Sequence, residues 1–84
     1  MNQAQDQIKA VIEQLESLQQ EEGVPKNVKT EIQSIIHTLR EPGEASMHIN
    51  KCLDKLDHLS QETTLEAFIR PQIWNIASML EKIQ

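Results

Sequence analysis

Apolar residues recur along the chain at spacings of three and four, the period of an amphipathic helix that packs one face on a core. No stretch alternates apolar and polar positions with the period of two that a half-buried strand requires. The pattern predicts helices at about residues 4–22, 25–40, 45–60 and 64–83. We therefore expect an all-α protein whose four apolar stripes face one core.

Turn-forming residues separate the first three segments. Gly23 supplies a stop after the first segment. Pro25 suits the first turn of the second helix, because its missing N–H would lack a partner there in any case. The sequence Glu-Pro-Gly-Glu at residues 41–44 ends that helix, and four residues are too few to separate two domains. We expect residues 1–84 to form a single domain.

The start of the fourth helix is less clearly marked. Thr63 and Glu66 have the spacing of a capping box, which predicts that the helix begins near residue 64. Pro71 then lies inside this helix, where it removes a backbone hydrogen bond and disfavours helical geometry at Arg70. We therefore predict a kink at Pro71.

The second half of the chain repeats the first at an offset of 41 residues without a gap. Six apolar positions are identical in this register, and most of the others keep their chemical class: Ile8/Ile49, Leu15/Leu56, Leu18/Leu59, Ile32/Ile73, Ile35/Ile76 and Leu39/Leu80. We interpret the halves as two helical hairpins, at about 4–40 and 45–83, related by a two-fold rotation. They should close into a four-helix bundle, because a solenoid needs three or more units to bury a continuous core.

Two short sequences carry a resemblance to a known family. Val24 to Lys29 reads V-P-K-N-V-K, and Ile73 to Ile76 reads I-W-N-I, followed by Leu80-Glu81. With these elements the chain resembles, over nearly its whole length, an archaeal family of short all-helical proteins catalogued only as an uncharacterised protein family. The resemblance implies a small helical bundle with no established activity. It also implies a proline at the start of the fourth helix, where this chain has Glu66. The segment from Pro25 resembles HEAT-like helical hairpin repeats more weakly.

Charge and composition exclude several classes of function. A net charge of −5 disfavours broad contact with a phosphate backbone, which needs a basic face. The longest apolar run is three residues, whereas a membrane span needs about 20. The polar N-terminus lacks the features of a secretory signal, and a single cysteine cannot form an internal disulfide. We expect a cytoplasmic protein without membrane contact.

Residues suited to chemistry are few and scattered. His48 and Cys52 lie four residues apart and could share a metal ion, as could Asp54 and His58, but a structural zinc site requires four ligands. The repeat aligns Cys52 with the core residue Val11, which favours a buried structural thiol. Both glycines serve as helix stops, and no nucleophile has a base beside it. We expect no metal, no cofactor and no enzymatic activity.

Three cations occupy unusual positions. Lys26 and Lys29 fall in the first turns of the second helix, where the helix dipole mildly disfavours positive charge, and Arg70 is the repeat equivalent of Lys29. These side chains either pair with acidic helix ends nearby or bind an acidic partner or nucleic acid.

Trp74, the only tryptophan, lies about 100° from the apolar stripe of its helix. Its repeat equivalent is the polar Gln33, and Phe68 likewise replaces Asn27. Either Trp74 anchors an interface, or it folds back over the bundle edge and shields Ala77.

The sequence therefore predicts a non-enzymatic helical interaction module or small scaffold that forms a homo-oligomer through its fourth helix. The candidate surface comprises Trp74, Arg70, Phe68, Lys26 and Lys29. The alternative is an accessory protein that binds RNA or a ribonucleoprotein through Lys26, Lys29 and Arg70.

Overall fold

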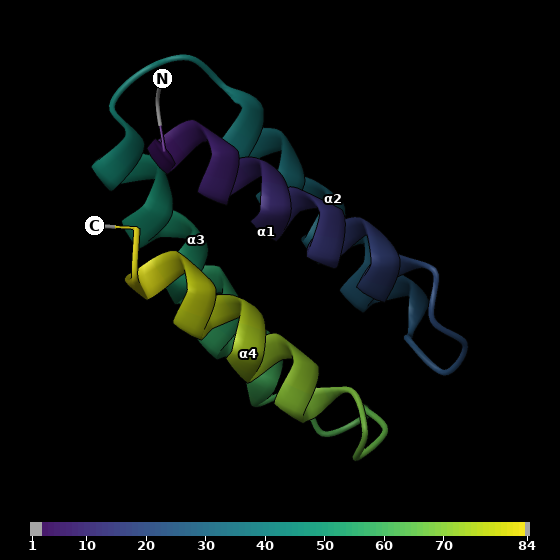
Figure 1. Ribbon diagram of the computed structural model, residues 1–84. Coiled ribbons are helices and arrows are strands. Elements are labelled where there is room, and N and C mark those ends of the chain that lie inside the picture. The colour runs from purple at the N-terminus through teal and green to yellow at the C-terminus, as the bar shows by residue number, and fades with distance from the viewer. Residues whose placement is uncertain (1–2, 84) are drawn as a thin grey trace.

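A computed structural model describes residues 3–83, which form four α-helices and no strand. The helices are α1 (Gln3–Gln19), α2 (Lys26–Arg40), α3 (Ala45–Ser60) and α4 (Arg70–Glu81). They run alternately up and down the long axis of an elongated bundle, 38 × 19 × 19 Å in extent (Figure 1). The predicted all-α four-helix bundle is confirmed.

Each helix packs against two neighbours. The backbone of α1 lies close to α2 and α4, and that of α3 likewise lies close to α2 and α4, whereas the diagonal pairs α1/α3 and α2/α4 are further apart. The turns at 20–25 and 61–69 lie at one end of the bundle, and the connector at 41–44 lies at the other (Figure 1). Short connections of this kind make consecutive helices antiparallel neighbours. The α1/α2 hairpin and the α3/α4 hairpin thus form opposite sides of the molecule.

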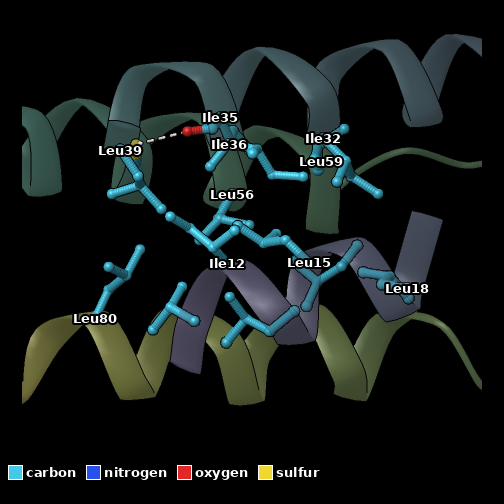
Figure 2. Close-up of a cluster of buried hydrophobic side chains, with 14 of the residues drawn as sticks. Ile12, Leu15, Leu18, Ile32, Ile35, Ile36, Leu39, Leu56, Leu59 and Leu80 are labelled. Carbon is cyan, nitrogen blue, oxygen red and sulfur yellow. Dashed lines mark hydrogen bonds between the residues drawn. The ribbon is translucent and has the colours of Figure 1, made fainter. Parts of the chain in front are cut away.

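The core between the hairpins is aliphatic, and side chains from all four helices meet in it (Figure 2). Most repeat-equivalent apolar residues are buried in pairs, such as Val11/Cys52, Leu15/Leu56, Val28/Ile69 and Ile32/Ile73. Complete burial of a leucine or isoleucine side chain contributes about 1.5–3 kcal/mol. This shared interior supplies the main driving force for folding.

The chain leaves α1 and α3 in the same way. At both exits, backbone N–H groups bond to carbonyls three residues earlier: Gln20 to Ser17 (3.2 Å), Glu21 to Leu18 (3.1 Å), Gln61 to His58 (3.2 Å) and Glu62 to Leu59 (3.0 Å). These four bonds obey the 41-residue register. A two-fold superposition of the complete hairpins stays a prediction.

Helix α4 begins at Arg70, six residues later than the sequence pattern predicted. Thr63 and Glu66 lie in the preceding turns, and the cap position belongs to Ile69 without a side-chain cap, so the predicted capping box is wrong. The predicted kink at Pro71 is also wrong, because this proline lies in the first turn of α4. A proline at that position breaks no helical hydrogen bond. Pro71 thus opens α4, in the role expected at Glu66.

The first hairpin turn differs less from expectation. Helix α1 ends at Gln19 rather than near residue 22, and the chain reverses through Gly23, whose φ of +92° lies in the region that favours glycine. Pro25 occupies the cap position just before α2 instead of its first turn. In the 41-residue register α4 thus begins three residues after the equivalent of the first residue of α2.

Candidate interaction surface

The outer side of the α3/α4 hairpin carries a groove with a tryptophan in its wall. We call this the tryptophan face; it is lined by Leu53, Leu56, Asp57, Trp74, Ala77, Ser78 and Glu81. Trp74 is 57% exposed, as its position off the apolar stripe predicted. Ala77 is half-buried in the same groove, so the ring borders Ala77 but remains mostly in solvent.

Two carboxylates, Asp57 and Glu81, border the tryptophan face. Their repeat equivalents, Glu16 and Arg40, form an ion pair across the α1/α2 hairpin, with 3.0 Å between Arg40 Nη2 and Glu16 Oε2. Across the α3/α4 hairpin the same positions hold like charges. Asp57 accepts a hydrogen bond of 3.3 Å from Gln61 Nε2, and within residues 3–83 neither carboxylate makes an ion pair. The face is thus apolar in its wall and negative at its rim.

The outer side of the α1/α2 hairpin is polar and carries cations. We call this the lysine face; it is lined by Gln19, Lys26, Lys29, Thr30, Gln33, Ser34 and His37. Gln19 Nε2 donates to the Lys29 carbonyl oxygen (3.1 Å) and to Gln33 Oε1 (3.0 Å), which links α1 to α2. In the part of the chain that the structure describes, neither Lys26 nor Lys29 forms an ion pair, so their predicted pairing with acidic helix ends is wrong.

Arg70 caps the end of α3. Its Nε donates to the Ser60 carbonyl oxygen at 2.7 Å, and its Nη2 donates to the Glu62 carbonyl oxygen at 3.1 Å. Carbonyls at a helix C-terminus lack helical partners, and a cation there also complements the dipole. Arg70 does not line the groove that Lys26 and Lys29 line, because its guanidinium is held at the end of α3.

Phe68 is 51% exposed but lies away from the tryptophan face, in the turn before α4. Its ring covers Gly23, since a side chain on that glycine would come within 3.6 Å of Phe68 Cζ. Phe68 therefore bridges the two hairpin turns. The sequence-predicted residues fall on three separate surfaces, of which only the tryptophan face combines an exposed aromatic ring with a groove.

The thiol of Cys52 is buried in the core, as the repeat predicted. Its Sγ donates to the Ile35 carbonyl oxygen at 3.8 Å (dashed line in Figure 2). Burial raises the pKa of this thiol to about 11, although Lys55 and Lys51 oppose the shift. Cys52 is thus protonated near neutral pH, which leaves it a weak nucleophile and a poor metal ligand. Across residues 3–83, no three His, Cys, Asp or Glu side chains group into a metal site.

A family model described as Uncharacterised protein family (UPF0147) matches residues 1–83. The chain belongs to this family. A UPF0147 protein of Archaeoglobus fulgidus is 30% identical over 76 residues, which cover 90% of this chain and 87% of the relative. One from Methanosarcina mazei is 26% identical over 83 residues, covering 98% and 89%. The resemblance to an uncharacterised archaeal family is confirmed.

Solved structures agree with the fold. The crystal structure of a UPF0147 protein from Thermoplasma acidophilum matches with a TM-score of 0.87 and 27% sequence identity, over 95% of both chains. A second crystal structure, of a protein of unknown function, matches with a TM-score of 0.86 and 28% identity, over 94% of this chain and 91% of the other. The four-helix arrangement is therefore shared within UPF0147. No helix within residues 3–83 is long and apolar enough to cross a bilayer.

Two features of this UPF0147 chain escaped the sequence analysis. Met47 on α3 is 63% exposed, and the opposed signs of Arg40 and Glu81 distinguish the two outer faces. Both were visible in the 41-residue register, because Met47 aligns with Asp6 and Arg40 with Glu81. Reading the register for differences as well as for identities would have found them.

Proposed function

We propose that this UPF0147 protein is a non-enzymatic interaction module that associates through the tryptophan face, with a second copy of the chain as its partner. The observation that carries the proposal is the 57% exposure of Trp74 beside a groove, on a helix whose isoleucines are buried. Tryptophan removes a large apolar area from water at a low cost in conformational entropy, which makes it a preferred interface anchor. Solvent exposure of this ring has no benefit for the isolated bundle.

The surroundings of Trp74 support the same proposal. Ala77 and Leu53 are half-buried in the groove, so a contact there would cover further apolar surface. The carboxylates of Asp57 and Glu81 lie at the rim, and a polar rim around an apolar centre is typical of protein interfaces. The protonated, buried Cys52 supports a non-enzymatic role.

A second candidate function, binding of RNA or a ribonucleoprotein, now rests on Lys26 and Lys29 alone. These cations form no ion pair with any residue from 3 to 83 and lie at the start of α2, where backbone N–H groups also attract anions. The net charge of −5 opposes this function, and the guanidinium of Arg70 already binds two backbone carbonyls. An RNA gel shift that disappears in Lys26→Gln/Lys29→Gln but persists in Lys9→Gln/Lys51→Gln would favour it.

The experiment that tests the proposed function is the hydrodynamic mass of wild type and Trp74→Ala over a range of concentrations. We expect wild type to exceed the 9.6 kDa of one chain as concentration rises. Trp74→Ala should associate more than ~10-fold more weakly, because truncation of a hot-spot residue costs about 2 kcal/mol or more and each 1.4 kcal/mol is about tenfold in Kd. Met47→Ala is the matched control, since Met47 is equally exposed but lines neither face. If Trp74→Ala only lowers the melting temperature and leaves the mass unchanged, the ring packs within its own chain and the proposal fails.

A further inference from the structure

We infer that the tryptophan face of one copy docks on the lysine face of the next, so that copies associate head to tail. This inference rests on the proposed function and names the partner surface. Each contact between copies would thus join two different, complementary faces, and not two identical faces.

The two faces share two equivalent positions on α2 and α4 and differ at the others. In the 41-residue register Gln33 of the lysine face aligns with Trp74 of the tryptophan face, and His37 aligns with Ser78. The lysine face is built from α1 and α2, and the tryptophan face from α3 and α4, which form opposite sides of the bundle. One copy therefore presents both faces at once, and neither covers the other.

Charge decides between head-to-tail association and pairing of two tryptophan faces. The tryptophan face has a negative rim, Asp57 and Glu81, and the lysine face has a positive pair, Lys26 and Lys29. Within residues 3–83, none of these four charges is neutralised by an ion pair. Two tryptophan faces docked on each other would bring carboxylates together, and like charges at an interface disfavour binding. Docking on the lysine face places opposite charges together instead.

The lysine face also suits the tryptophan ring itself. A lysine ammonium above an indole face is attracted by the ring electrons, and the aliphatic stem of lysine covers apolar surface. Lys29 is half-buried against the bundle, so its stem is already partly ordered and loses less conformational freedom on binding. The uncharged Thr30 is exposed and small, and the ammonium of Lys55, which donates to Ser34 Oγ at 2.8 Å, adds a third positive charge beside this face.

A head-to-tail contact leaves one free face at each end of every complex. Such contacts build rings when the rotation closes, and open chains when it does not. The average mass should therefore continue to rise with concentration beyond that of a dimer, or stop at a ring of three or more copies. Added salt should weaken association, because exposed charges are screened over about 10 Å at 0.1 M salt.

Two variants remove one face each. Glu81→Arg gives the tryptophan face the residue that the first hairpin has at position 40, where Arg40 pairs with Glu16, so that the new arginine can pair with Asp57. Lys26→Gln/Lys29→Gln removes the charges of the lysine face. The double variant Lys9→Gln/Lys51→Gln is the matched control, since it removes two exposed lysines that line neither face. Far-UV circular dichroism and the melting temperature confirm that each variant is folded.

Sedimentation velocity then gives the test. We expect Glu81→Arg and Lys26→Gln/Lys29→Gln each to remain at 9.6 kDa where wild type and the control associate. An equimolar mixture of these two variants should form a 1:1 complex that does not grow, because it retains one intact tryptophan face and one intact lysine face.

If Lys26→Gln/Lys29→Gln associates like wild type while Trp74→Ala does not, the partner is not the lysine face. The inference then fails and the proposed function stands. If Trp74→Ala also associates like wild type, or wild type remains a monomer, both fail. An equimolar mixture that stays monomeric while wild type associates also overturns the inference.

Discussion

The two hairpins share an interior but differ on their outer sides. Facing the core, most equivalent positions hold identical or similar apolar residues that are buried in both hairpins. On the outside, two polar contacts link α1 to α2 in the first hairpin: the Arg40–Glu16 ion pair and the Gln19–Gln33 hydrogen bond. The second hairpin replaces three of these residues, Glu16, Arg40 and Gln33, with Asp57, Glu81 and the exposed Trp74. Packing explains the inner positions but not the outer differences, which the proposed association of copies would explain.

The turns of the two hairpins show a second difference. By the 41-residue register α4 should begin at residue 67, the equivalent of Lys26, yet it begins at Arg70. Pro71 lies within its first turn, a position that proline tolerates because its missing N–H would lack a helical partner there. The longer turn accompanies the contact of Arg70 with the end of α3. The later start of α4 thus goes with a structural role for this cation.

The largest expected effect concerns Ile36, which is buried, whereas its equivalent Ala77 borders the tryptophan face. We expect Ile36→Ala to reduce the free energy of unfolding by about 3 kcal/mol, because it leaves a cavity in the core. Ala77→Ile should change it by less than about 1 kcal/mol, since the added atoms extend into an open groove. Urea unfolding measures both. Equal costs at the two positions would show that Ala77 is enclosed as tightly as Ile36 and does not border an open groove.

The next effect compares Arg70 with Lys29. Arg70→Ala should cost about 2 kcal/mol, because it removes charge-assisted hydrogen bonds to two carbonyls at the end of α3. Lys29→Ala should stay within about 0.5 kcal/mol, as is usual for surface substitutions. The measurement is the unfolding midpoint in urea at pH 7. A similar loss at both positions would contradict the capping role assigned to Arg70.

The smallest effect concerns Cys52, whose equivalent is Val11. At pH 7 Cys52→Val should change the free energy of unfolding by less than about 1 kcal/mol, because the two side chains are similar in size and both positions are buried. Above pH 9 the difference should grow. The folded thiol has a raised pKa of about 11, against an ordinary value of 9.0, so the folded state holds its proton where the unfolded chain loses it.

The contribution of the protonated Cys52 thiol to the free energy of unfolding is complete below pH 9. It is lost between about pH 9 and 11, where wild type becomes less stable relative to Cys52→Val. Parallel urea unfolding curves at pH 7, 9 and 10 provide the comparison. A difference that does not change with pH would mean that the thiol is accessible to solvent.

The fold could be predicted from sequence because it depends on repeated local patterns. Apolar spacing located all four helices, and the repeat identified Cys52 as a core residue and Trp74 as an outer one. The predicted start of α4 was wrong because Thr63 and Glu66 have the spacing of a capping box but do not cap this helix. As a consequence, the prediction placed Arg70 in the interior of the helix, whereas it is the first residue of α4. The sequence could not show that Lys26 and Lys29 make no ion pair among the described residues, because the partners of surface side chains depend on geometry that sequence spacing does not contain.

The account depends most directly on whether Trp74 becomes buried when copies meet, and its own fluorescence reports this because it is the only tryptophan. We predict that the emission of wild type lies at the long wavelength of an exposed indole at low concentration and shifts to shorter wavelength as the sedimentation mass rises. In Lys26→Gln/Lys29→Gln the emission should stay at long wavelength over the same range. Emission already at short wavelength in the monomer, or unchanged while wild type associates, would contradict the claim that Trp74 is the contact.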